Sequence, residues 1–130
     1  MALEVCSTGE VLALKRLLNH TAADDCKLKL YSDNITPDDD SVPGSFTECA
    51  IAGYAAKTLT GASWTVETSE SVTTGSYAEQ TFSFTGSGTV YGYFVTDNAG
   101  TTLIWAEKFA AAIPITSGDS IAVTPQITAD

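Results

Sequence analysis

A series of short segments in which apolar and polar residues alternate constrains the fold of this chain most strongly. The clearest is Cys26–Tyr31, where Cys26, Leu28 and Leu30 alternate with two lysines. A period of two is that of a β-strand with one buried face. Comparable segments cover residues 47–50, 55–60, 64–67, 77–85, 89–96, 102–109 and 120–124. Short strands separated by turn residues predict a mainly β fold, an antiparallel β-sandwich or barrel-like domain of about eight strands.

The connections between these segments differ in length. Residues 32–44 hold three successive aspartates and two prolines, so we expect a long exposed loop outside the sheet, either mobile or ordered only by a neighbour. Residues 69–76 read as a polar connection and residues 97–100 as a tight turn. Gly92 lies within a predicted strand, which indicates the close approach of another backbone or an aromatic ring.

The N-terminal segment has a different period. Ser7 followed by Glu10 has the spacing of a capping box at the start of a helix. Val11, Leu14 and Leu18 then share one helical face, which Leu17 widens, and the helix should end near residues 19–20. We therefore divide the chain into an N-terminal arm and amphipathic helix, residues 1–20, and a single β-sandwich domain, residues 21–130.

Residues 1–6 and the helix form the candidate interface with a partner. Leu3 and Val5 alternate with Glu4, which predicts an extended arm able to add a strand to the sheet edge of a neighbouring subunit. The predicted contact residues are Leu3, Val5, Val11, Leu14, Leu17 and Leu18. Packing on the chain's own sandwich explains Leu14 and Leu18 equally well.

Composition excludes several classes of function. Sixteen acidic residues against six basic ones give a net charge of -10 over 130 residues, the opposite of what phosphate binding requires, so we expect no nucleic-acid partner. The sequence holds no run of 18 apolar residues and no basic leader, so we expect neither a membrane partner nor a secretory signal. The three cysteines have no metal-ligand spacing and are expected to be reduced, small apolar residues.

Residues that could take part in catalysis or in metal or sugar binding do not form a recognisable site. His20 is the single histidine and lacks a nucleophile motif around it, and Asp38–Asp40 lack the spacing of a calcium loop. Trp64, Trp105, Tyr91 and Tyr93 suit either a sugar-stacking platform or core packing, and core packing is favoured, with Tyr91 and Tyr93 on one strand face. We predict no catalytic residue, no cofactor and no metal, and hence no enzyme.

Four stretches are distinctive enough to compare with known proteins: residues 28–37 (LKLYSDNITP), 53–61 (GYAAKTLTG), 91–97 (YGYFVTD) and 101–109 (TTLIWAEKF). Together they resemble a group of small virion structural proteins from tailed bacteriophages, including cyanophages and other environmental phages. The resemblance runs from the helix to near the C-terminus. The family has no active-site motif, so it implies no catalytic or binding residues.

The resemblance implies a component of the phage particle, made in the host cytoplasm and located in the virion. Within the particle we expect a capsid decoration (cement) protein that bridges capsomers and stabilises the head. Its expected partners are further copies of itself, a trimer as the leading arrangement, and the major capsid protein or other virion proteins. The alternatives are a tail, neck or fibre-proximal virion protein, or a carbohydrate-binding module for host attachment.

Overall fold

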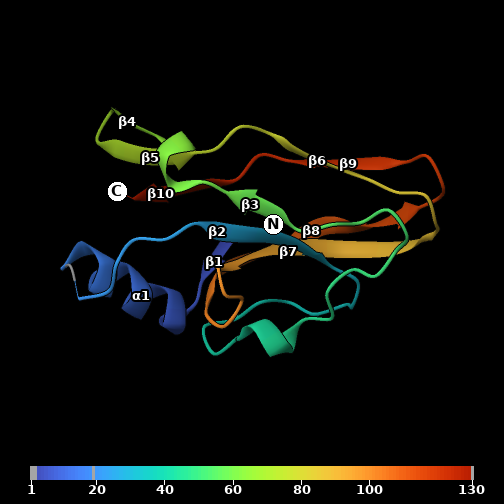
Figure 1. Ribbon diagram of the computed structural model, residues 1–130, viewed down its shortest axis with the longest axis horizontal. Helices are drawn as coiled ribbons and strands as arrows, with labels where there is room; N and C mark the ends of the chain where they lie inside the picture. The colour runs from blue at the N-terminus through green and yellow to red at the C-terminus, as the bar shows by residue number, and fades with distance from the viewer. Residues whose placement is uncertain (1–2, 19, 130) are drawn as a thin grey trace.

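The computed structural model describes residues 3–18 and 20–129, which form a mainly β, antiparallel fold with one α-helix near the N-terminus (Figure 1). The helix is α1 (Ser7–Leu17), and two single 3₁₀ turns, η1 (Pro43–Ser45) and η2 (Gly61–Ser63), lie in connections. The strands are β1 (Leu3–Val5), β2 (Cys26–Tyr31), β3 (Lys57–Leu59), β4 (Thr65–Ser69), β5 (Val72–Ser76), β6 (Gln80–Ser83), β7 (Gly88–Asp97), β8 (Leu103–Ile115), β9 (Ser120–Val123) and β10 (Gln126–Ala129).

These strands form three antiparallel sheets. The central sheet has five strands in the order β1-β8-β7-β2-β3, and it is accompanied by a three-stranded sheet, β10-β5-β4, and a two-stranded sheet, β6-β9. Figure 1 shows the two small sheets above the central sheet and α1 with residues 32–46 below it. The predicted antiparallel, sandwich-like β fold is therefore confirmed.

Each face of the central sheet carries a cluster of buried residues. On one face Leu28, Val95 and Trp105 belong to a cluster that includes Phe82 and Ile121 from the two-stranded sheet. Because successive residues of a strand point to opposite faces, Tyr31 and Phe94 enter a second cluster on the other face, together with Cys6 and Phe46. The Phe46 ring stacks on Phe94 at 5.2 Å and meets Tyr31 at 4.8 Å. This second cluster explains why the sheet carries a covering loop.

Residues 32–46 are held by their own chain. The Tyr31 hydroxyl donates to the Ile35 carbonyl at 3.1 Å, and the Thr47 backbone N–H donates to Asp33 Oδ1 at 3.0 Å. Ser41 is buried and its hydroxyl donates to Asp38 at 2.9 Å. The loop lies outside the sheets, as predicted, and most of its side chains are exposed. The expectation that it is either mobile or ordered only by a neighbour is corrected, because these contacts come from within the chain.

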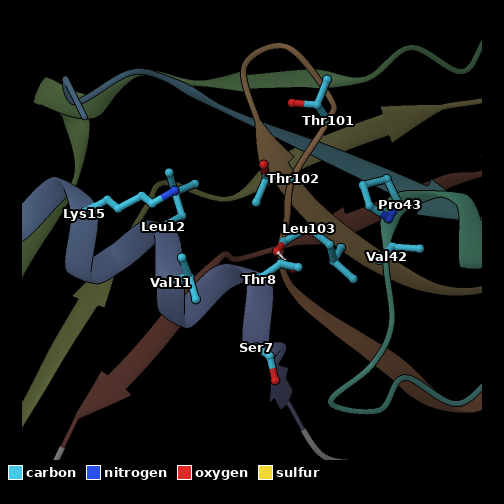
Figure 2. Close-up of a pocket in the computed structure, with 10 residues that line it drawn as sticks. All are labelled: Ser7, Thr8, Val11, Leu12, Lys15, Val42, Pro43, Thr101, Thr102 and Leu103. Carbon is cyan, nitrogen blue, oxygen red and sulfur yellow. Dashed lines mark hydrogen bonds between the residues drawn. The ribbon is translucent and has the colours of Figure 1, made fainter. Parts of the chain in front are cut away.

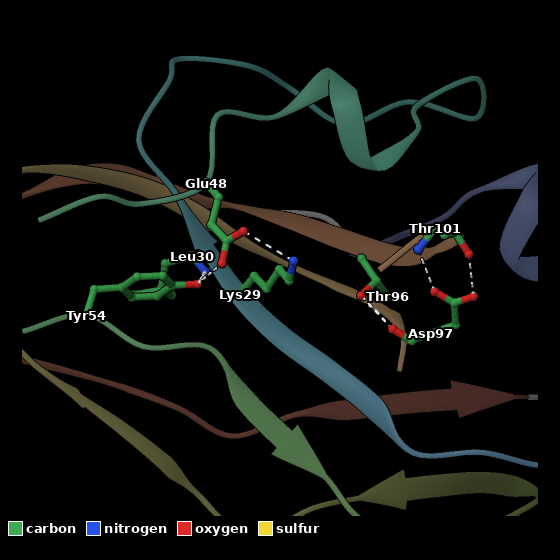
Figure 3. A network of polar contacts seen from close by, with 7 residues as sticks. All are labelled: Lys29, Leu30, Glu48, Tyr54, Thr96, Asp97 and Thr101. Atoms are coloured by element: carbon green, nitrogen blue, oxygen red, sulfur yellow. Dashed lines mark hydrogen bonds and ion pairs between the residues drawn. The ribbon is translucent and has the colours of Figure 1, made fainter. Parts of the chain in front are cut away.

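A side-chain network joins the segment after this loop to β2 (Figure 3). Residues 47–50 were expected to form a strand, but they make only one isolated bridge, between Glu48 and Tyr31. Instead, the Tyr54 hydroxyl donates to Glu48 at 2.9 Å and accepts from the Leu30 backbone N–H at 3.3 Å. Lys29 pairs with the other carboxylate oxygen of Glu48 at 3.2 Å.

Three further elements differ from the prediction. Residues 69–76 are not a connection, because β5 pairs with β4 across a turn in which Glu70 and Ser71 both have positive φ. The strand expected at 102–109 continues to Ile115. The extension was not predicted because the alanines at 110–112 show no apolar–polar alternation. Residues after Pro125, where no strand was predicted, form β10 and pair with β5.

The register of β7 and β8 also corrects one face assignment. A shift between Val90 and Gly92 interrupts the alternation. Tyr91 therefore packs against the second cluster while Tyr93 belongs to the first, so the two tyrosines do not share a face. The interpretation of Gly92 is confirmed, since a Cβ there would overlap the Glu107 carbonyl oxygen and the Tyr31 ring.

We predict that Gly92→Ala destabilises the fold by about 2 kcal/mol or more, because neither the backbone of β8 nor the packed Tyr31 ring can withdraw from the added methyl group. Urea unfolding measures the change. Gly44→Ala is the matched control: no residue that the structure describes lies within 4 Å of its added Cβ, so it should alter stability by less than about 0.5 kcal/mol. Equal stability of the two variants would contradict the packing described at Gly92.

Asp97 caps the turn between β7 and β8 (Figure 3). Its Oδ1 accepts from the backbone N–H groups of Thr101 at 2.8 Å and Thr102 at 3.1 Å, and its Oδ2 accepts from the Thr101 hydroxyl at 2.9 Å. Partial burial alone would raise the pKa of Asp97, but these hydrogen bonds outweigh it and lower the pKa below its ordinary value. The ionised carboxylate therefore stabilises the folded chain.

Asp97→Ala should lower the free energy of unfolding by about 1–2 kcal/mol at pH 7. Since the folded pKa is depressed, the contribution is fully present above the unfolded pKa and is lost as pH falls through the folded value. The difference from the unaltered chain should thus shrink in urea titrations near pH 2.5. Asn98→Ala serves as the neighbouring control, and a difference that stays constant with pH would refute the role of the charge.

Candidate interaction surface

The first turn of α1 attaches the helix to β8 and to the loop. Gly9 is buried, and a Cβ there would overlap the backbone of Ile104. The Thr8 hydroxyl donates to the Leu103 carbonyl at 2.9 Å (Figure 2). The Ser7 hydroxyl donates to Asp39 at 2.8 Å. These contacts fix the direction of the helix relative to the sheet.

The expected capping box is not formed. The helix begins at Ser7, and Cys6 is its N-cap without a side-chain hydrogen bond. Ser7 uses its hydroxyl on Asp39 instead, because the loop brings that carboxylate to the helix start. The helix ends at Leu17 with Leu18 as its C-cap, shortly before the predicted end near residues 19–20; residue 19 lies outside the described residues.

Four large aliphatic side chains on α1 and its C-cap residue are exposed. Val11 is 52%, Leu14 58%, Leu17 79% and Leu18 74% accessible. We call this set the apolar stripe. A shallow hollow of about 560 Å³ lies along it, lined by the stripe residues other than Leu17 and by Lys15 and His20. The alternative that Leu14 and Leu18 pack on their own sandwich is thereby contradicted, and the stripe stays uncovered in the isolated chain.

A groove continues the apolar surface towards the loop. It has a volume of about 350 Å³ and lies between α1 and residues 42–43, with Val11 on one side and Val42 and Pro43 on the other (Figure 2). Val42 is itself 45% exposed. Sequence analysis missed Val42, because an isolated valine beside three aspartates gives no periodic signal.

A cleft of about 330 Å³ separates α1 from the three-stranded sheet. Its lining is almost wholly apolar and includes both tryptophans, Trp64 and Trp105. Arg16 also lines it, and its buried Nε–H has no hydrogen-bond acceptor among residues 3–18 and 20–129. Burial raises the pKa of Cys26 and the nearby Arg16 guanidinium partly offsets that rise.

The aromatic residues favour core packing over a sugar platform. Trp105 and Tyr93 are each only 4% exposed, and Trp64 meets Trp105 edge to face at 6.1 Å. Burial raises the pKa of Tyr93, and the hydrogen bond that its hydroxyl donates to Glu107 at 2.6 Å raises it further. Such rings are not available as a flat stacking surface, so the core interpretation is confirmed for Trp105 and Tyr93.

The N-terminal segment pairs within its own chain. The backbone of Leu3–Val5 forms β1, antiparallel to Trp105–Glu107 of β8, and Cys6 is fully buried. The extended conformation is as predicted, but the expectation that the segment reaches a neighbour's sheet edge is corrected for these residues. Removal of residues 1–6 would also remove a core side chain, that of Cys6. A role for Leu3 and Val5 in partner contact stays a prediction.

The cysteines behave as apolar core residues. Cys6, Cys26 and Cys49 are buried, free thiols. Within the described part of the chain, no three His, Cys, Asp or Glu side chains are grouped to hold a metal. His20 is exposed after the helix. No helix that the structure describes is long and apolar enough to cross a membrane.

The charges around the apolar stripe are unpaired. Glu10 in the first turn and Lys15 in the last turn are both exposed. The one ion pair between described residues joins Lys29 to Glu48, away from the helix. Glu10 and Lys15 thus border an apolar surface and have no partner on the described chain.

The chain matches no family model, and no curated protein sequence is significantly similar to it. The candidate surface is therefore inferred from the geometry of the described residues.

Cys6 offers a direct check that β1 and the start of α1 are packed as described. Burial raises the pKa of its thiol to about 11, and the carboxylates of Glu4 and Asp39 add to the rise. At pH 8 about one thiol in a thousand is then ionised. We predict that iodoacetamide labels Cys6 at least about a hundredfold more slowly in the folded chain than in urea, as measured by peptide mass spectrometry. Similar rates in both states would show that residues 3–6 detach from β8.

Proposed function

We propose that this protein is a non-enzymatic structural component of a bacteriophage particle and, within the particle, a capsid decoration (cement) protein. The observation that carries the proposal is the apolar stripe, which a rigid β fold holds in place and leaves uncovered. Burying one such side chain contributes about 1.5–3 kcal/mol. A surface of this kind on a strongly acidic protein is typical of a contact site for another protein.

The sequence resemblance supports the same proposal through the scaffold. Three of its four stretches cover most of β2, the second half of β7 and the first half of β8, and the fourth contains β3. All four therefore contribute to the central sheet. The resemblance thus concerns the framework that carries α1, while the contact surface is proposed from geometry.

Decoration requires many modest contacts rather than one strong site. Copies arranged in the symmetric positions of a shell gain avidity by multivalency, even when each contact is weak. Oligomers that bridge capsomers, with a trimer as the leading arrangement, would combine self-contact with contact to the major capsid protein. In this role the protein is located in the virion.

Two alternatives stay as predictions. A tail, neck or fibre-proximal virion protein would use the same contact surface in far fewer copies. A carbohydrate-binding module would need exposed aromatic faces with polar groups around them, and the cleft beside Trp64 and Trp105 is almost wholly apolar. A glycan array on the unaltered protein tests that alternative better than Trp105→Ala, which would also remove core packing.

We predict that Leu14→Ser combined with Leu18→Ser weakens binding to particles lacking this protein by at least about tenfold, because two apolar contacts are lost. Both side chains are exposed, so the thermal midpoint should change little. Co-sedimentation with particles measures binding. Val66→Ser on β4 is the control, since Val66 is 69% exposed but lies outside the stripe. Unchanged binding of the double variant would refute the stripe as the contact surface.

A further inference from the structure

The residues of the apolar stripe have the spacing of a helix-pairing seam. Val11, Leu14 and Leu18 are separated by three and then four positions, the a-d-a order of a coiled-coil heptad. Leu17 then occupies a g position beside the seam. The hollow lined by Val11, Leu14 and Leu18 lies between these side chains, where a knob from a facing helix would insert. The matching occupant is therefore another helix.

The bordering charges specify which helix and in which direction. In this heptad Glu10 occupies a g position and Lys15 the e position five residues later. In parallel coiled coils a g residue of one helix faces the e residue of the next heptad on its partner. Two copies of α1 in parallel therefore place Glu10 opposite Lys15 of the other copy, in both directions. In an antiparallel pair g faces g and e faces e, and neither charge meets its opposite.

We propose that the apolar stripe is occupied by α1 of a second copy of this chain, packed in parallel with interchain pairs between Glu10 and Lys15. The inference deepens the proposed function by assigning the stripe to contacts between copies on the shell, so that loss of the stripe weakens particle binding by removing those contacts. It rests on the proposed function only for the particle context. The first turn fixes α1 on β8 through Gly9 and Thr8, so the seam is oriented before association. A seam of three layers is short, so we expect association that is weak in solution and reinforced on the shell.

Charge reversal tests the parallel register. Sedimentation equilibrium of the purified chain of 130 residues, without particles, should show reversible self-association. Glu10→Lys and Lys15→Glu should each weaken it by about fivefold or more, since each places like charges across the seam. The double variant E10K/K15E, which keeps the wild-type net charge, should restore it to within about twofold. An equimolar mixture of the two single variants should associate more tightly than either alone.

Two controls separate charge from structure. Glu79→Lys makes the same change in charge at an exposed position outside the helix, and it should leave association unchanged. Leu14→Ser should reduce association by a similar factor at low and high salt. The effect of the charge variants should instead shrink as salt screens the charges.

Two results would overturn the proposal. A chain that stays monomeric at millimolar concentration would show that the stripe does not receive a second copy. Association that the double variant fails to restore would rule out the parallel register. Binding to depleted particles is measured separately, so a monomer that still binds particles refutes this inference and leaves the proposed function intact. Self-association without particle binding would support this inference and refute the proposed function.

Discussion

Strand β8 is the element on which the rest of the structure depends. It pairs with β7 over most of its length and with β1 on its other edge, and its first residues receive the start of α1. The backbone of β8 packs closely against Gly92 at Glu107 and against Gly9 at Ile104. One strand therefore determines both the core of the central sheet and the position of the helix.

This arrangement explains how a short helix can display apolar residues. An isolated helix of 11 residues is marginal in water. Here the first turn is tied to β8 and to Asp39, while Leu12 and Arg16 line the cleft towards the three-stranded sheet. The inner face supplies the stability, which leaves the outer face free for a contact. An exposed stripe would otherwise be a liability for solubility, and the net charge of -10 opposes nonspecific association.

Apolar–polar alternation in the sequence predicted those strands in which one face is buried and the other faces solvent. Strand β2 has its predicted bounds because its lysines and apolar residues alternate without interruption. Strand β5 was missed because its residues are mostly threonine, serine and glycine, and because its turn uses Glu70 and Ser71 rather than the usual Asn-Gly. The Tyr91–Tyr93 error came from a register shift, which depends on the partner strand and leaves no local pattern.

The candidate surface was predictable only in part. The spacing of Val11, Leu14, Leu17 and Leu18 defines an apolar face, but the same spacing serves a helix packed on its own domain. Tertiary structure was needed to show that Gly9, and not the leucines, faces β8. Gly9 did carry a signal, since glycine is a poor helix former and its presence in a first turn indicates close packing.

The copy number of this protein in purified particles tests the central claim most directly. Quantitative mass spectrometry against the major capsid protein gives that number. A decoration protein that covers the shell should be present in hundreds of copies, in a simple ratio to the capsid protein. A total of a dozen or fewer would assign it to the tail or neck, and its absence from particles would contradict a structural role in the virion.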